Sequence, residues 1–79
     1  MVTAFVMIRV GTGEVLDFER VVKEEIKKMK EVKTVYSVFG RYDLIAQATA
    51  PTLEDLSRLA DKIRAVAGVL STESLIVHT

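Results

Sequence analysis

The sequence has no cysteine and no tryptophan, and it contains a single histidine, His78, and a single proline, Pro51. The absence of cysteine excludes disulfide bonds, a thiol nucleophile and every cysteine-ligated metal site. One histidine cannot form a histidine cluster, so we expect neither a metal site nor a cofactor. His78 is also the only base available to the serines, and its place beside the C-terminus argues against a Ser-His hydrolase.

An excess of charge of one sign is also missing, because 11 lysines and arginines face 11 aspartates and glutamates. Without a positive excess, little attracts a phosphate backbone, and we expect no direct DNA binding. No apolar run is long enough to span a bilayer, and the N-terminus lacks the basic start and cleavage site of a signal peptide. These absences predict a soluble, cytoplasmic protein that does not enter a membrane.

Asparagine is absent as well, and glutamine occurs once, at Gln47. Segments such as residues 19–30 are crowded with charges of both signs, a bias seen in heat-adapted proteins, which suggests a thermophile. The 79 residues allow one domain, 1–79, and a domain of this size buries only roughly 60 to 65% of the surface of its unfolded chain. A partner would therefore add useful burial.

Hydrophobic periodicity divides the chain into six elements. Residues 2–10 alternate as a strand, and a helix is expected from about residue 14 to residue 30. Strands are expected at 32–39 and 42–50, and the Gly40-Arg41 pair between them predicts a two-residue type II′ hairpin. After Pro51, a helix capped by Thr52 precedes a last strand within 69–79. The order βαββαβ predicts a ferredoxin-like α+β fold, with two helices on one face of a four-stranded antiparallel sheet.

The face of the sheet without helices is unusually apolar. Alternation along residues 2–10 places Phe5 and Met7 on this open face. Monomers seldom expose an apolar patch of that extent, which favours a dimer packed sheet to sheet. Scattered surface apolar residues are the alternative. Further residues of this face are expected among Phe39, Ile45, Thr49 and Ile76.

Few residues are candidates for chemistry. Most carboxylates lie on the helices among lysines and arginines, as a solvated face would have them. The segment Gly11-Thr12-Gly13-Glu14 joins a strand to a helix N-terminus, where an anion can bind. It is too short to be a nucleotide fingerprint, and a turn with Thr12 as helix cap is the simpler interpretation.

The remaining candidate is the segment Gly40-Arg41-Tyr42-Asp43. As pure structure, Gly40 makes a turn, Tyr42 packs its ring and Asp43 starts a strand. An exposed carboxylate at a strand end would contribute under about 0.5 kcal/mol. Aspartate is nevertheless depleted in strands, which makes Asp43 an unusual choice at that point. The segment is therefore either a hairpin or part of a ligand site.

Two motifs resemble a known family. The run Val-x-x-Val-Tyr-x-Val-x-Gly-x-Tyr-Asp-Leu extends from Val32 to Leu44, and Gly-Val-x-x-Thr-x-Ser-x-Ile-Val extends from Gly68 to Val77. With the βαββαβ order they resemble the effector-binding (RAM) domain of the Lrp/AsnC transcriptional regulators, over nearly the whole chain. The helix-turn-helix domain of the full-length regulators is missing here, so we expect a stand-alone version of the domain.

The resemblance implies a function and an assembly. Proteins of this family bind free amino acids in clefts between dimers, which have a dimeric α/β barrel-like packing and assemble into rings; here we expect an octamer or decamer. Carried over, Gly40, Arg41 and Asp43 would line the cleft; by their chemistry, the backbone N–H groups of Gly40 and Arg41 can bind a carboxylate and Asp43 can bind an ammonium, of either the α-groups or the side chain of the ligand. The same resemblance assigns ligand contacts to Tyr42, Thr72 and Ser74. It also implies a regulator rather than an enzyme, one that can join the rings of a full-length relative.

Three alternatives share the element order. An ACT domain also binds amino acids, near the first strand-helix loop, here residues 11–14. A purely structural oligomerisation module needs no ligand. A small dimeric monooxygenase is the least supported alternative. Such sites use a histidine, tryptophan or asparagine in the sheet cleft, whereas this chain has no tryptophan, no asparagine and one histidine beside its C-terminus.

Overall fold

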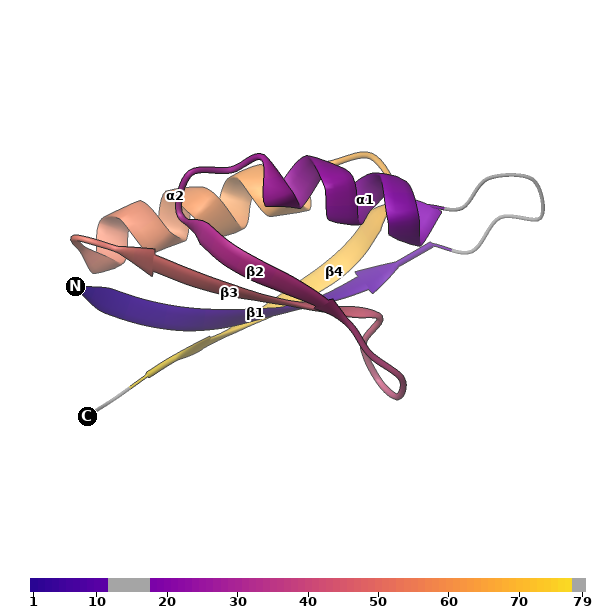
Figure 1. Ribbon diagram of the computed structural model, residues 1–79, viewed down its shortest axis with the longest axis horizontal. Helices are drawn as coiled ribbons and strands as arrows, with labels where there is room; N and C mark the ends of the chain where they lie inside the picture. The colour runs from indigo at the N-terminus through magenta and orange to yellow at the C-terminus, as the bar shows by residue number, and fades with distance from the viewer. Residues whose placement is uncertain (12–17, 78–79) are drawn as a thin grey trace.

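The computed structural model describes residues 1–11 and 18–77, and its elements follow the predicted βαββαβ order. Their bounds are β1 (Val2–Val10), α1 (Phe18–Lys27), β2 (Val32–Ser37), β3 (Leu44–Ala50), α2 (Leu53–Arg64) and β4 (Val69–Ile76). Both helices lie on the same face of the sheet (Figure 1). The predicted start of the first helix, its cap at Thr12, the 11–14 anion site beyond Gly11, and His78 lie outside the described residues.

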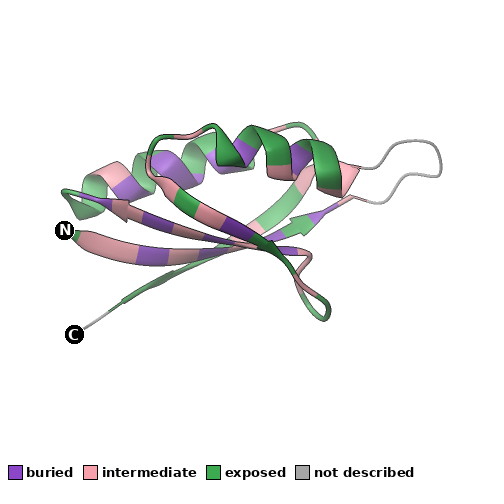
Figure 2. Ribbon diagram, in the orientation of Figure 1, coloured by how far each residue is buried: buried purple, intermediate pink, exposed green. Residues whose placement is uncertain are grey.

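The four strands form one antiparallel sheet in the order β2-β3-β1-β4, as a ferredoxin-like fold requires. Every second residue of the two central strands is buried under the helices (Figure 2). On β1 and β3 these residues are Ala4, Val6, Ile8, Val10, Leu44, Ala46, Ala48 and Ala50. The period-2 pattern therefore predicted the core-facing side of β1 correctly.

The helices complete the core with residues spaced three or four apart. Val22 and Ile26 of α1 are fully buried, as is Ile63 of α2. Helix α2 starts as predicted, because the Thr52 hydroxyl oxygen accepts a hydrogen bond from the Asp55 N–H at 3.2 Å. This bond satisfies one of the donors that a helix N-terminus leaves unpaired.

The β2–β3 connection differs from the prediction. β2 ends at Ser37 and β3 begins at Leu44, so a loop of residues 38–43 replaces the two-residue turn. The Val38 N–H donates to the Asp43 carbonyl at 2.9 Å, and the Asp43 N–H donates to the Ile8 carbonyl at 2.9 Å. Gly40 has a φ of +121°, a conformation that suits glycine. The loop projects from the end of the sheet, on the side away from the helices (Figure 1).

The open face carries apolar side chains, as the alternation predicted. Phe5 and Met7 are half-buried there, and Met7 lies opposite Ile45 in the ladder. Two other predicted residues are elsewhere: Phe39 lies in the loop, and Ile76 pairs with Ala4 and so shares its helix-covered face. The remaining open-face residues include Thr34, Tyr36, Gln47, Thr49, Glu73 and Leu75.

Candidate ligand-binding site

Asp43 is tied to β1 through its side chain. Its Oδ2 atom accepts a hydrogen bond from the backbone N–H of Val10 at 2.8 Å. The last regular pair of this ladder joins Ile8 to Leu44, so the carboxylate takes the place of the next backbone acceptor. Aspartate is unusual inside a strand but well suited to ending one in this way. This bond ties the end of the 38–43 loop to β1.

Tyr42, the preceding residue, reaches across the open face. Its hydroxyl donates a hydrogen bond to Oε2 of Glu73. Tyr42 precedes β3, Glu73 lies on β4, and β1 runs between these strands, so the tyrosine side chain crosses β1. Glu73 is opposite Met7 in the ladder, which places the contact on the open face.

Charged groups surround this contact. The hydrogen bond to Glu73 is the main cause that raises the pKa of the Tyr42 hydroxyl above its ordinary value, and the negative charge of Glu73 adds to it. Arg41 and Arg9 act in the opposite direction. Glu73 and Arg9 are not among the residues predicted from the sequence. The alternation along β4 is the signal that could have identified Glu73, because it separates residue 73 from 72 and 74.

Thr72 and Ser74 lie on the other face of the sheet. Thr72 pairs with Ile8 and Ser74 with Val6, and both partners are buried beneath the helices. Directly opposite residues of an antiparallel pair share a face. Within one chain, the sheet therefore separates these two hydroxyls from the Tyr42 side chain. Of the six predicted ligand residues, the structure brings together those of the 40–43 loop, and it keeps Thr72 and Ser74 apart from them.

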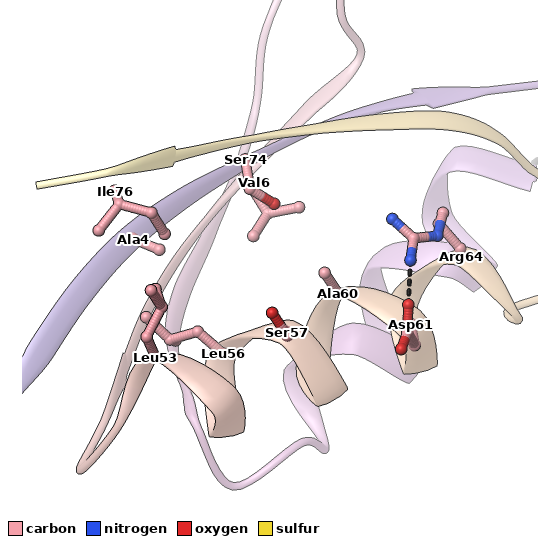
Figure 3. A pocket seen from close by; sticks show the side chains of 10 residues that line it. All are labelled: Ala4, Val6, Leu53, Leu56, Ser57, Ala60, Asp61, Arg64, Ser74 and Ile76. Atoms are coloured by element: carbon pink, nitrogen blue, oxygen red, sulfur yellow. Dashed lines mark hydrogen bonds and ion pairs between the residues drawn. The ribbon is translucent and has the colours of Figure 1, made fainter.

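Ser74 instead lines a groove between α2 and β4 (Figure 3). The groove has a volume of about 360 Å³. Its floor is apolar, and hydroxyl groups stand on both of its walls, Ser57 on α2 and Ser74 on β4. We call it the α2–β4 groove; its floor residues are Ala4, Val6, Leu56 and Ala60.

Residues 1–11 and 18–77 contain no group of three or more acidic or histidine side chains that could hold a metal ion. None of the helices formed by these residues is long and apolar enough to cross a membrane.

Comparison with known proteins identifies relatives over nearly the whole chain. The family model for the Lrp/AsnC ligand binding domain matches residues 3–78. The HTH-type transcriptional regulator FL11 of Pyrococcus abyssi is 30% identical over 74 residues, which are 94% of this chain and 46% of that protein. The chain thus spans about half the length of the curated relatives it matches.

Solved structures agree with this match. The protein TTHA0845 from Thermus thermophilus is 34% identical, with a TM-score of 0.90, and the match covers 100% of this chain and 95% of that one. A feast or famine regulatory protein from M. tuberculosis, in complex with L-methionine, is 28% identical with a TM-score of 0.78. That match covers 100% of this chain and 51% of the tuberculosis protein.

Proposed function

The chain belongs to the Lrp/AsnC ligand-binding domain family, and from this premise we propose that it is an amino-acid-binding, ring-forming module of transcriptional or metabolic regulation. The proposed ligand follows from the chemistry of the 40–43 loop and from the relative that binds L-methionine. The proposed assembly follows from the apolar open face and from the way the predicted ligand residues are divided between the two faces of the sheet.

The division of the ligand residues is the observation that carries the proposal. Thr72 and Ser74 face the helices, while Tyr42 crosses the opposite face. One chain therefore offers two half-sites, and a cleft between copies can combine the loop of one with β4 of another. This supports a ligand held between dimers.

The loop has suitable groups for a zwitterion. A carboxylate can accept about four hydrogen bonds, and the bond from Val10 uses one of those of Asp43. The remaining capacity can take an ammonium group. The N–H groups of Gly40 and Arg41 would bind the ligand carboxylate, and the hydroxyls of Thr72 and Ser74 would complete the site from the neighbouring copy.

The open face supports a dimer. Phe5 and Met7 are half-buried at its centre, and Tyr36 and Leu75 toward its edges are 53% and 51% exposed. Packing this face against a second copy would remove all four from water and give the dimeric α/β barrel-like arrangement. Four or five such dimers would form the octamer or decamer.

The proposal extends to the role of the protein. The relatives are named transcriptional regulators, and we propose that this single domain, 1–79, acts without catalysing a reaction. The balanced charge argues against direct DNA binding, so regulation would proceed through mixed rings with a full-length relative in the cytoplasm.

Calorimetric titration with each of the twenty amino acids tests the ligand. Asp43→Ala removes a charge-assisted contact and should weaken binding at least about tenfold, and Thr72→Val should act in the same direction but less. Glu54→Gln changes an exposed carboxylate of α2 outside the groove and serves as control. Equal affinity in parent and Asp43→Ala would move the site elsewhere, and binding lost on changing Gly11 would favour the ACT-like alternative.

A purely structural module is the second candidate. The bond between Asp43 and Val10 accounts for the geometry at the base of the loop without any ligand. Absence of binding for all twenty amino acids, with assembly intact in light scattering, would favour this candidate.

A further inference from the structure

A second pocket lies at the end of the sheet away from the 38–43 loop, where β1 and β2 begin and β3 ends (Figure 1). Its volume is about 280 Å³. Typical ligand sites have volumes of about 300 to 1,000 Å³, so this pocket suits a ligand smaller than a drug-sized molecule. We call it the Glu31 pocket; its walls include Lys30, Glu31, Lys33, Thr49, Pro51 and Asp55.

Glu31 carries a buried oxygen atom without a partner. Its Oε1 atom is shielded from solvent and accepts no hydrogen bond, and it is the only side-chain nitrogen or oxygen in this state among residues 1–11 and 18–77. Buried polar atoms are almost always hydrogen-bonded, and leaving one unpaired lowers stability. An ionised carboxylate only accepts hydrogen bonds, so a donor from outside the chain would satisfy this oxygen.

The backbone of Glu31 is fixed to the sheet. The N–H of Thr49 donates to the Glu31 carbonyl at 3.0 Å, and the following residue, Val32, pairs with Ala48. The register between β2 and β3 then shifts, and Lys33 is the extra residue on β2. Such irregularities often redirect a side chain beside a functional site. The carboxylate therefore stands on a well-held segment with a lysine on each side of it in the sequence.

The charged groups of the pocket are not paired with one another. Neither Glu31 nor Lys30 nor Lys33 forms an ion pair with any residue in the described part of the chain. The second carboxylate of the pocket, that of Asp55, already has its partners. Its Oδ1 atom is bound by Arg58 at 2.7 Å, and its Oδ2 atom accepts the hydroxyl of the α2 N-cap at 2.9 Å. One carboxylate and two ammonium groups are therefore left for a ligand.

We propose that the Glu31 pocket binds an amino acid with an acidic side chain, glutamate or aspartate. The ligand ammonium donates to Oε1 of Glu31, and the two ligand carboxylates accept from Lys30 and Lys33. The hydroxyl of Thr49 on the pocket wall can make one further hydrogen bond. A simple amine would leave both lysines without a counter-ion, and a neutral amino acid would leave one. This site is separate from the 40–43 loop and does not depend on the function proposed for that loop.

Calorimetric titration of the full chain with L-glutamate and with L-aspartate tests the site. The parent should bind at least one of them, and Glu31→Gln should weaken that binding at least about tenfold, because it removes the charge that the ligand ammonium meets. The double variant Lys30→Gln/Lys33→Gln should have an effect of the same size. Glu24→Gln and Lys27→Gln change exposed residues of α1 outside the pocket and are the matched controls. A parent that binds neither ligand overturns the proposal, and so does an unchanged affinity in Glu31→Gln.

Three further measurements separate this site from its alternatives. L-glutamine lacks the side-chain charge and should bind the pocket at least about tenfold more weakly than L-glutamate, whereas equal affinities would overturn the ligand class. Asp43→Asn should leave binding of the acidic amino acid unchanged. Binding that is lost in Asp43→Asn and kept in Glu31→Gln would place the acidic ligand at the loop and overturn the proposal.

The melting temperature of the ligand-free protein distinguishes a binding role of Glu31 from a structural one. Glu31→Gln removes a partly buried charge that has no partner in the chain, so this variant should melt no lower than the parent. A melting temperature well below that of the parent would assign Glu31 to the support of the fold and would overturn the proposal.

Discussion

The carboxylate of Asp43 holds the backbone N–H of Val10 at 2.8 Å, across 33 residues of sequence. This contact corrects the expectation of an exposed strand-end carboxylate, because Asp43 is half-buried and hydrogen-bonded. The same side chain therefore supports the sheet and stands in the proposed ligand loop. Its two roles can be separated by substitutions that keep or remove its hydrogen-bond acceptor.

Asp43→Ala should lower the free energy of unfolding by about 1 to 3 kcal/mol, because it leaves the Val10 N–H without its acceptor. Asp43→Asn keeps a hydrogen-bond acceptor of the same shape and should lower the free energy of unfolding by less. Denaturant unfolding of the three proteins measures the difference. Parent-like stability of Asp43→Ala would mean that water replaces the carboxylate at Val10. In calorimetry, Asp43→Asn should still weaken amino-acid binding, because it lacks the negative charge.

Tyr42→Phe should change how stability depends on pH. The hydrogen bond to Glu73 raises the pKa of Tyr42 in the folded protein. The contribution of this bond to folding stability is therefore complete below the pKa of about 10 that tyrosine has in the unfolded chain. It is lost as the pH rises through the folded pKa. The difference in unfolding free energy between the parent and Tyr42→Phe should therefore narrow above about pH 10. Denaturant unfolding of both proteins, at pH values from about 8 upward, measures this difference. A constant difference would show that the hydroxyl is not bound to Glu73 in solution.

Changing both Phe5 and Met7 to glutamate should convert dimers into monomers or make the chain insoluble. Burial of each side chain contributes about 1.5 to 3 kcal/mol, so the dimer dissociation constant should rise at least about a hundredfold. Light scattering gives the mass. Val21→Glu, on the exposed face of α1, controls for the added charge. An unchanged mass of the double variant would exclude the open face as the interface.

Gly68→Ala should destabilise the fold more than Gly40→Ala. Both glycines have positive φ, +100° and +121°, where alanine is strained by about 1 to 3 kcal/mol. A Cβ atom at Gly68 would also approach Val22 and Phe18 to 3.1 and 3.2 Å, whereas one at Gly40 meets nothing within 4 Å. Overpacking adds about 1 to 3 kcal/mol at Gly68. Thermal unfolding of the two variants measures the stability that each loses. Equal losses would mean that α1 shifts to make room for the methyl group at residue 68.

Much of the architecture follows from local patterns. The alternation of residues 2–10 determined which side of β1 is buried, and the proline and threonine at 51 and 52 marked the start of α2. The motifs in 32–44 and 68–77 identified the family, which the family model confirms. These features depend on backbone geometry with periods of two or 3.6 residues, and on short spacings that the sequence displays directly.

Contacts between distant segments decided the rest. Residues 38–43 form a loop longer than the predicted Gly-Arg turn, and the carboxylate of Asp43 in it accepts a hydrogen bond from Val10 on another strand. The register between β1 and β4 places Ile76, Thr72 and Ser74 on the helix-covered face of the sheet, which is the face opposite to that of the Tyr42 side chain. A shift of one residue in that register would reverse the face of each of these side chains. The sequence by itself determined the elements and the family, whereas only tertiary pairing decided which predicted ligand residues one chain can bring together.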